Sequence, residues 1–518
     1  MDILVSAQQM KTAEKYMIEE LGLPSLVLME KAAERVFEIA SEVCEEIYDT
    51  RENVCVLCGC GNNGGDGLAV ARMMLQRGID VSVCIIGDEN HATEEFLLQK
   101  SIYEKMGGCI DETPDYEATL IIDAMLGIGI KGDVRGRYLE VIDELNATHK
   151  DIGNVVIAID IPSGINADTG VNMGAAVEAD YTVCLGCLKT GLLLADGPSH
   201  AGKTLCFDIG IEPPESCAAI RFDYEDIANI MPKRCDNSNK STYGKITIIA
   251  GSEGMPGAAV LATRASLTGG VGMVKLLTDK PVIPIIVDAM PEAMVDSYYG
   301  DGEVRYDTID KAIDWCDAVL IGPGLGRDGL AEDVFVYVMD AVNKSHKPLV
   351  IDADGLFHLS SHMELLDMLK DDITILTPHP GEFARLFGTE IIEGKHQDLD
   401  FLKAMSSKYK VTILAKDYTS ITASAEEQGS VAYINTFGTD ALATAGTGDV
   451  LAGIILTMLV NTDDAVNACL IGTAIHGLAG ILASEETNNY AVTASDVVHF
   501  IPDAINSILV FERQCGET

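Results

Sequence analysis

The residues of this sequence best suited to chemistry are Gly446-Thr447-Gly448-Asp449, which precede a long apolar segment that we predict to be helical. A Gly-x-Gly-Asp turn at a helix start directs several backbone N–H groups and the positive end of the helix dipole at one point. Such a site can stabilise charge on a phosphoryl group during transfer, while Asp449 accepts the proton of the attacking hydroxyl. The alternative is a glycine-rich turn in which Asp449 only caps the helix.

Other loops of the same half favour the catalytic interpretation of Asp449. This half contains six segments rich in small or polar residues: 251–259, 322–326, 352–355, 377–382, 416–420 and 435–438. The first five come at the ends of short apolar runs that we predict to be strands. His379 lies in one of these segments between Pro378 and Pro380, which restrict the direction of the chain. A lone histidine is more often structural than catalytic, but this position favours a substrate contact.

The first half contains a second glycine-rich turn, residues 59–67, with the sequence GCGNNGGDG. It follows the apolar run VCVLC and precedes a helical pattern, so free N–H groups at the helix start could bind an anion. No Lys-Ser/Thr pair follows, which excludes a Walker loop, and the match to dinucleotide-binding glycines is loose. The oxygens of its two asparagines and its aspartate suit a ribose or a hard cation.

Two further acids end apolar runs in the first half. Asp123 ends TLIID and Asp160 ends VVIAID, and glycine-rich loops follow at 127–133 and 161–164. A single aspartate at a strand end is usually a helix cap. Because ligands of open parallel sheets bind beyond the carboxyl ends of the strands, these acids and the 62–66 turn together predict a site.

The elements that must position these residues alternate along both halves. We predict a helical region at 7–49 and strands at 54–59, 81–87, 119–127, 155–164, 181–186, 245–252, 272–278, 318–324, 348–355, 373–382 and 411–416. Alternation of strands and helices predicts α/β domains, with a doubly wound parallel sheet in the first half. Pro213, Pro214 and Pro232 interrupt the pattern and predict a linker at 213–240.

The composition narrows the partners. The chain has 518 residues, 47% of them hydrophobic, and this length suits two or three domains. Its formal net charge of −44 disfavours nucleic acid and membrane surfaces as partners. No secretion signal opens the sequence, and no apolar run approaches the roughly 20 residues of a membrane-spanning helix. We therefore expect a cytoplasmic protein with reduced thiols among its 14 cysteines. Cys55, Cys58 and Cys60 could suggest a metal, but their apolar setting favours buried structural cysteine.

The motifs of the first half resemble the NAD(P)H-hydrate epimerase family over residues 1–212: GNNGGDG, DAMLGIGIKGDVRG and AIDIPSGINADTG. The resemblance implies a Rossmann-like three-layer fold and interconversion of the R and S hydrates of NADH and NADPH. It implies that Asp160 is the catalytic, substrate-contacting acid and that K⁺ is bound by Asn63, Asp123 and Ser163. The implied substrate contacts are Asn62, Asn63, Gly64, Gly65, Asp66, Gly127, Ile128, Gly129, Ile130, Lys131, Gly132 and Asp133.

The second half is similar to the ADP-dependent (S)-NAD(P)H-hydrate dehydratases of the ribokinase-like superfamily over residues 225–518. KSTYGKITIIAGSEGMPGAAVLA, IGPGLG, TPHPGE and NTFGTDALATAGTGDVLAGI carry the similarity. It implies a second three-layer αβα domain in which a nucleotide, ADP or ATP, phosphorylates the hydrate with Mg²⁺, and phosphate elimination restores NAD(P)H. Asp449 would be the base, with Ala259, Gly324 and His379 also contacting the hydrate. The implied nucleotide contacts are Lys416, Asp417, Tyr418, Thr419, Ser420 and Gly448, and a homo-oligomer is expected.

The chain departs from the dehydratase pattern at Asn239 and Ser241, where His and Gly are usual, and at Asp417, where Gly is common. The last change puts a carboxylate beside the expected nucleotide loop, so the choice between ADP and ATP stays open. Two other functions remain alternatives: a different ribokinase-like kinase, acting on a hydroxymethylpyrimidine or a sugar, and a non-catalytic nucleotide sensor. The intact acids Asp66, Asp123, Asp160 and Asp449 disfavour the sensor.

Overall fold

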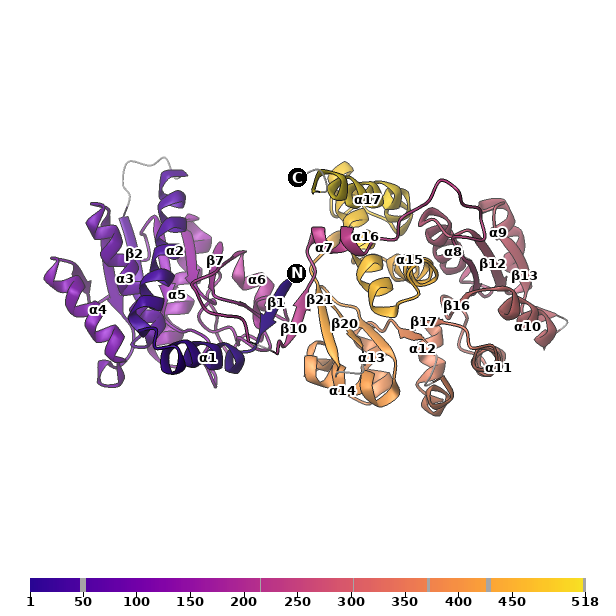
Figure 1. Cartoon of the computed structure of the whole chain (residues 1–518), viewed down its shortest axis with the longest axis horizontal. Helices are drawn as coiled ribbons and strands as arrows, with labels where there is room; N and C mark the ends of the chain where they lie inside the picture. The colour runs from indigo at the N-terminus through magenta and orange to yellow at the C-terminus, as the bar shows by residue number, and fades with distance from the viewer. Residues whose placement is uncertain (47–52, 215, 301, 370–372, 425–429, 516–518) are drawn as a thin grey trace. The chain divides into compact units, whose positions relative to one another are not determined.

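A computed structural model describes residues 1–46, 53–214, 216–300, 302–369, 373–424 and 430–515 (Figure 1). The chain divides into two compact units, Asp2–Ala219 and Ile220–Thr518, with Met1 grouped with the second. The division falls inside the segment 213–240 that the sequence predicts as a linker. That segment includes a short strand, β10 (Ala219–Arg221), and a helix, α7 (Tyr224–Ile230), while its residue 215 lies outside the described residues.

The N-terminal unit is built on a parallel sheet with the strand order β4-β3-β2-β5-β6-β7-β9. The strands are β2 (Asn53–Cys58), β3 (Asp80–Ile85), β4 (Cys109–Asp111), β5 (Leu120–Ala124), β6 (Val155–Ile159), β7 (Tyr181–Leu185) and β9 (Lys203–Phe207). The order reverses between β2 and β5, as in Rossmann folds, and ligands of such sheets bind at this reversal. A further parallel pair joins β1 (Asp2–Val5) to β8 (Leu188–Lys189).

Helices cover both faces of this sheet because β2 is apolar on both sides. Val54 and Val56 pack in one core with α2 (Ser25–Glu46) and α3 (Asn62–Gln76), whereas Cys55 and Leu57 pack in another with α5 (Arg137–Ile152). α4 (Glu94–Lys105) lies against α3. The continuous helix predicted at 7–49 is interrupted: α1 (Ala7–Lys15) and a π-helical turn (Tyr16–Glu20) end before Pro24, and residues 47–49 lie outside the described ranges.

The C-terminal unit contains a mixed sheet with the order β13-β12-β11-β16-β17-β18-β19-β20-β21-β10. The strands are β11 (Lys245–Ile249), β12 (Met273–Thr278), β13 (Met294–Ser297), β16 (Ala318–Ile321), β17 (Leu349–Ile351), β18 (Thr374–Leu376), β19 (Thr412–Ala415), β20 (Ser420–Ser424) and β21 (Val431–Asn435). Neighbours are parallel from β13 to β19, but β20 runs antiparallel to β19 and to β21. The reason is the short connection after β19, because a parallel crossover needs a dozen or more residues.

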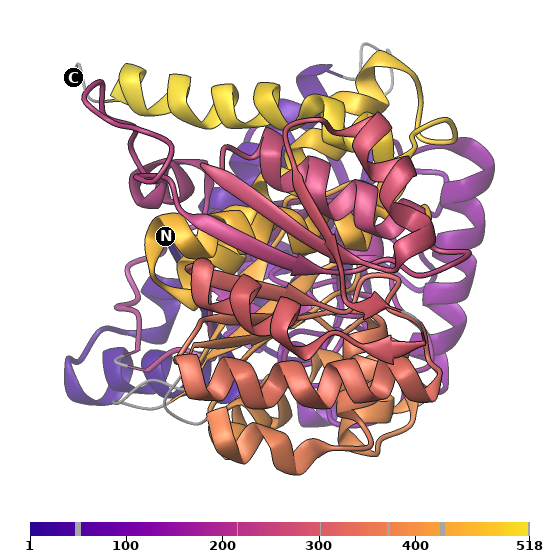
Figure 2. The ribbon, with the colours of Figure 1, turned by 90° about the vertical axis from the view of Figure 1, so that its right-hand side faces the viewer.

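Two layers of helices enclose this second sheet. α8 (Pro256–Thr268), α15 (Thr447–Thr462), α16 (Ala465–Glu486) and α17 (Ala494–Cys515) share a core with the alternate residues Ile246 and Ile248 of β11. Thr247 faces the other way and donates a hydrogen bond to Ala312 O of α10 (Tyr306–Trp315), 2.9 Å away. In Figure 2, α17 is the yellow helix along the top of this unit. The fold is therefore a three-layer αβα domain.

One helix corrects a prediction about apolar length. Among the described residues, α16 is long and apolar enough to cross a membrane by length and composition, with a mean hydropathy of 1.7. The expectation that no apolar run approaches that length is therefore wrong. In the folded unit, 67% of the apolar stretch is buried, packed against α15 and α17. Its composition is accounted for by its place in the core of this domain.

Candidate active sites

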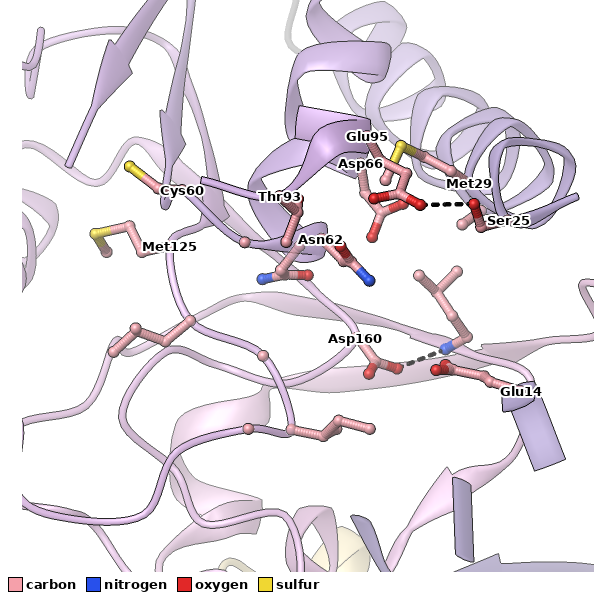
Figure 3. Close-up of a pocket in the computed structure, with 18 of the residues that line it drawn as sticks. Glu14, Ser25, Met29, Cys60, Asn62, Asp66, Thr93, Glu95, Met125 and Asp160 are labelled. Atoms are coloured by element: carbon pink, nitrogen blue, oxygen red, sulfur yellow. Dashed lines mark hydrogen bonds between the residues drawn. The ribbon is translucent and has the colours of Figure 1, made fainter. Parts of the chain in front are cut away.

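A cavity of about 630 Å³ lies at the point where the strand order of the N-terminal unit reverses (Figure 3). Side chains from α1, α2, the start of α3 and the loops after β5 and β6 line it. The structure brings these predicted site residues to its wall: Asn62, Asn63, Asp66, Gly127, Ile128, Gly129, Ile130 and Asp160. The turn at 59–67 and the loops after Asp123 and Asp160 thus converge, as the strand-end argument predicted.

Other predicted contacts lie outside the cavity wall. A Cβ on Gly64 would stand 1.7 Å from Gly59 O, and one on Gly65 would stand 2.6 Å from the terminal methyl of Met29. Gly64 is therefore needed for close packing of the turn, whereas at Gly65 the flexible end of Met29 could shift. Lys131, Gly132 and Asp133 are exposed and do not line the cavity.

Asp160 is held by a buried lysine that the sequence motifs did not indicate. Its Oδ1 accepts hydrogen bonds from Lys189 Nζ and from the backbone N–H of Leu185, the latter at 3.0 Å. Lys189 is fully buried and also donates to Leu185 O at 2.7 Å. Burial alone would lower the pKa of Lys189, but the charge of Asp160 raises it above its usual value, so the ammonium persists. Asp160 also has a φ of +67°, a strained backbone position that fixes its direction.

Two more carboxyl groups share the cavity with Asp160. Glu14 comes from α1 and Asp66 from α3, and both line the wall. Burial, followed by repulsion from Asp160, raises the pKa of each above its usual range, strongly so for Asp66. The ammonium groups of Lys189 and Lys11 oppose this shift at Glu14 and are not among the causes acting on Asp66, so these acids have unlike environments, which is the kind of arrangement that separates proton donors from acceptors.

Two of the predicted potassium ligands, Asp123 and Ser163, are hydrogen-bonded to each other, and the third, Asn63, lies on the cavity wall. Ser163 Oγ donates to Asp123 Oδ1 at 2.6 Å, and Ser163 N donates to Asp123 Oδ2 at 2.7 Å, with both residues fully buried. Burial raises the pKa of Asp123 to about 6 although these hydrogen bonds oppose the shift. Asn63 lies on the cavity wall, and its buried Nδ2 has no hydrogen-bond partner within the described residues. The donor set of carboxylate, hydroxyl and amide oxygen fits a hard cation, since an amide rotated by half a turn would present its oxygen instead.

Asp449 of the C-terminal unit lies in the first turn of α15, close to a second buried lysine. Lys416 Nζ donates to Asp352 Oδ1 at 2.7 Å, and Thr377 Oγ1 donates to the same oxygen at 2.7 Å. Burial and the neighbouring Asp352 raise the pKa of Asp449 to about 7, and Lys416 opposes the shift. A carboxyl group with this pKa can accept a proton near neutral pH and return it, as a general base must.

His379 is the N-cap of α13 (Pro380–Phe387) and has a defined tautomer. Its Nδ1 accepts hydrogen bonds from the backbone N–H groups of Gly381 at 3.0 Å and Glu382 at 3.4 Å. Burial and Lys416 lower the pKa of His379, so the neutral ring carries its hydrogen on Nε2, which lies 3.3 Å from Glu382 Oε1. Half of the side chain stays exposed, so a ligand would meet a hydrogen-bond donor here. Burial raises the pKa of Glu382 to about 7.

The small residues of this site are placed by close packing. A Cβ on Gly448 would lie 3.5 Å from Lys416 Nζ, so Gly448 leaves room beside that ammonium. Gly324 has a φ of +58° and little space, because a Cβ there would stand 2.9 Å from Met255 O. Ala259 is fully buried in α8 against Gly251, so the predicted contact of Ala259 with the hydrate is not open in this structure.

The segment predicted to contact the nucleotide has varied surroundings. Thr419 is buried, Lys416 is largely buried with 17% of its side chain exposed, Tyr418 is exposed, and Ser420 begins β20. Asp417 turns its Oδ2 toward His396 Nε2 at 2.7 Å and Gln397 Nε2 at 2.8 Å, and the bond from His396 lowers its pKa.

The other two departures, Asn239 and Ser241, form part of an exposed turn. Asn239 Oδ1 accepts a hydrogen bond from Ser241 N at 2.9 Å, and the side chains of both residues lie on the surface. A local turn of this kind is a usual role for asparagine. Nothing in these contacts touches the Gly-x-Gly-Asp loop.

Sequence reasoning missed two charged residues of the N-terminal site, Glu14 and Lys189. Asp352 and Glu382 lie in the predicted segments 352–355 and 377–382, although no role was assigned to them. One signal was available for Lys189, the only charged residue in the apolar stretch 181–194. A lone charge in such a run must be paired when it is buried. Glu14 had no such signal, because helix α1 approaches the cavity only through tertiary packing.

Comparison with known proteins agrees with both halves of this description. Residues 25–191 match the family described as YjeF-related protein N-terminus, and residues 246–503 match the family described as NAD(P)H-hydrate dehydratase. A bifunctional NAD(P)H-hydrate repair enzyme from Moorella thermoacetica is 32% identical over 98% of this chain and 97% of its own length. One from Escherichia coli is 30% identical over 96% of this chain and 93% of its own.

A solved ribokinase-like superfamily protein from Enterococcus faecalis matches in structure with a TM-score of 0.50 and 24% identity, covering 57% of this chain and 99% of that one. Fold and sites thus define a two-domain α/β enzyme, Rossmann-like in its first unit and ribokinase-like in its second. The full-length similarity is more specific. The chain belongs to the family of bifunctional NAD(P)H-hydrate repair enzymes.

Proposed function

We propose that this chain repairs hydrated NADH and NADPH: its first unit interconverts the R and S hydrates, and its second dehydrates the S form at the expense of ADP. The observation that carries the proposal is the full-length similarity: a bifunctional NAD(P)H-hydrate repair enzyme aligns with 98% of this chain. Each unit also has its own strand-end site with a buried lysine paired to an acid. The pairing of activities is chemically sensible, because a stereospecific dehydratase needs a partner that recycles the other epimer.

In the epimerase site, Asp160 is the proposed acid–base residue beside the C6 hydroxyl of the hydrate. Its Oδ1 is occupied by Lys189 and Leu185 N, which orients the carboxylate toward substrate bound in the cavity. The backbone N–H groups at the start of α3 suit the phosphates of the dinucleotide. Asp160 can then transfer protons while the C6–O bond breaks and forms again on the opposite face.

In the dehydratase site, Asp449 is the proposed base for phosphoryl transfer. It takes the proton of the C6 hydroxyl, and the oxygen attacks the terminal phosphorus of the nucleotide. The N–H groups at the start of α15 stabilise charge on the transferred group. Phosphate then leaves with the C6–O electron pair, a proton leaves C5, and the ring double bond of NAD(P)H is restored. Nε2–H of His379 would hold the hydrate by donating a hydrogen bond.

The cations belong to the same proposal. K⁺ would be held by Asn63, Asp123 and Ser163, whose oxygen donors suit it. Mg²⁺ would accompany the nucleotide. In the part of the chain that the structure describes, no group of three or more His, Cys, Asp or Glu side chains could hold a metal ion. Mg²⁺ usually binds through phosphates with one or two carboxylates, so the nucleotide itself would supply most of its ligands.

The proposal also covers the location of the protein, its oligomeric state and the nucleotide that donates the phosphoryl group. We place the protein in the cytoplasm as a homo-oligomer, acting without nucleic acid or membrane. Asp417 does not rule out a nucleotide at 416–420, because its carboxylate is directed to His396 and Gln397. ADP is the expected donor, and comparison of ADP with ATP at equal concentration would decide the preference.

The test is recovery of reduced nicotinamide absorbance from a mixed R/S NADH hydrate with ADP. Complete recovery at an enzymatic rate requires both activities and is the expected result. Recovery of the S fraction alone, with only slow spontaneous conversion of the rest, would contradict an epimerase in the first unit. Nucleotide consumption with a different hydroxyl acceptor and none with the hydrate would favour another ribokinase-like kinase.

A further inference from the structure

Among the carboxyl groups that line the N-terminal cavity, those of Asp66 and Asp160 have unequal partners. Asp160 has two donors to its Oδ1, the ammonium of Lys189 and the N–H of Leu185. Asp66 has none: within the described ranges, no hydrogen bond or ion pair reaches its carboxyl group. Figure 3 shows Asp66 on one wall of the cavity, with Asp160 and Glu14 together on another.

The surroundings of Asp66 disfavour its ionised form. Burial, Asp160 and Glu14 raise its pKa well above the usual range. The remaining charged and titratable side chains on the cavity wall are Lys11 of α1, Glu95 of α4, Tyr138 of α5, Cys60, Asp88 and His91. The acid of α4 is engaged elsewhere, since Glu95 Oε1 accepts the hydroxyl of Ser25 at 2.7 Å. No cation is paired with Asp66 in the part of the chain that the structure describes, so its neutral form is the stable one.

Epimerisation at C6 needs both a proton donor and a proton acceptor. When the C6–O bond breaks, its electron pair stays on oxygen, and a proton turns this leaving group from hydroxide into water. The ring nitrogen supplies the electron pair that forms the N1=C6 bond. Water then adds to C6 from the other face and loses a proton. One carboxylate can serve the second step, but the first needs a group that already carries a proton.

We infer that Asp66 is a further catalytic residue of the epimerase reaction, the acid that protonates the departing C6 hydroxyl, while Asp160 accepts the proton from the water that adds. The inference rests on the proposed epimerase function. In each turnover one proton leaves Asp66 and one reaches Asp160, and solvent in the open cavity returns both groups to their starting states. Division of labour between two carboxyls in unlike environments is how acid–base enzymes work at neutral pH.

The test is the pH profile of epimerisation by wild type and by Asp66→Asn, which keeps the shape of the side chain and removes its proton donor. Wild type should lose activity as pH rises through the pKa of Asp66. The kcat of the variant should fall by a factor of about 100 or more, since a general acid contributes roughly 10²–10⁴-fold. Its KM should change by less than about threefold. The variant should no longer lose activity as pH rises. The dehydratase activity of the same chain, measured on pure S hydrate, checks folding and should be unchanged.

Matched variants separate this role from a structural one. Glu19→Gln removes an exposed carboxyl group from the π-helical turn that follows α1, and it should leave the epimerase rate unchanged. A kcat for Asp66→Asn within threefold of wild type overturns the inference. So does a lower kcat whose alkaline limb is unaltered. Should Asp66→Asn not fold, the wild-type profile decides, because a rate independent of pH above neutrality excludes an acid with a titrating proton. A wild type without any epimerase activity would instead contradict the proposed function itself.

Discussion

At the residue scale, each candidate site contains a lysine whose side chain is fully or largely buried. Lys189 pairs with Asp160 and Lys416 pairs with Asp352. Burial alone would lower the pKa of each lysine, and its acidic partners instead raise it, so each ammonium is fixed in place. A fixed ammonium orients its carboxylate and sets the charge available to neighbouring acids. Such pairs are weak evidence for stability, because desolvation cancels much of their attraction.

The Lys189–Asp160 pair gives a prediction for folding. Lys189→Met leaves a carboxylate without its ammonium and should destabilise the N-terminal unit by about 3–5 kcal/mol, whereas Lys189→Met with Asp160→Asn should lose clearly less. Urea unfolding followed by circular dichroism measures both. Trp315 is the chain's single tryptophan and lies in the C-terminal unit, so its fluorescence provides the control. Equal destabilisation by the single and double variants would show that the pair is not the cause.

Asp449 gives a prediction for pH. Its pKa in the folded protein, about 7, lies above its ordinary value of 3.8, so the native state holds this proton more tightly than the unfolded state. Stability therefore falls as pH rises from about 4 to about 7, and Asp449→Asn should raise the melting temperature most above pH 7. Activity has the opposite trend, because a base works deprotonated: dehydratase kcat/KM should fall below about pH 7.

The control for Asp449 is the same variant's epimerase rate, which should be unchanged. Asp449→Asn should lose at least about 100-fold in dehydration, the contribution expected of a general base. If dehydratase kcat/KM did not change between about pH 5 and about pH 8, the range in which this group titrates, Asp449 would be excluded as the base.

At the element scale, the start of α3 depends on how closely its turn approaches β2. A Cβ on Gly64 would meet Gly59 O at 1.7 Å, while one on Gly61 would meet nothing within 4 Å. Gly64→Ala should therefore destabilise the N-terminal unit by at least about 1–3 kcal/mol, and Gly61→Ala should be near neutral. Thermal melting of the two variants side by side is the measurement. Equal melting temperatures would mean that the turn can move without cost.

The elements also show what sequence can predict. All eleven predicted strands exist, because short apolar runs bounded by glycine are a strong local signal. The antiparallel β20 and β21 were not predicted, since the apolar residues of β20 alternate with polar ones and its reversal depends on a short turn after β19. The strand-end acids Asp123 and Asp160 could be found because α/β sheets gather their ligands there. Asp449 could be found because a Gly-x-Gly-Asp turn marks the start of a helix. Glu14 could not, since only tertiary packing brings α1 to the cavity.

At the scale of the whole molecule, the charge of −44 raises a question about anionic substrates. Lysines and arginines number 36 against 80 acids, so the surface field repels both dinucleotide and ADP. Local groups must overcome this field: helix N-termini at Asn62 and Thr447, and the two buried ammonium groups. These act at short range and are poorly screened by salt, whereas the surface charge is screened. Moderate salt should therefore favour substrate binding.

Each site is complete within its own unit, and this leads to a prediction about division of labour. Glu14, Asp66, Asp160 and Lys189 all lie in Asp2–Ala219, while Asp352, Lys416 and Asp449 all lie in Ile220–Thr518. Asp160→Asn should recover only the S fraction of a mixed hydrate quickly, and Asp449→Asn should recover none. Mixed together with ADP, the two variants should restore complete recovery of the absorbance, because the hydrate released by one can diffuse to the other. A mixture that recovers no more than Asp160→Asn alone would mean that epimerised hydrate does not leave the chain that made it.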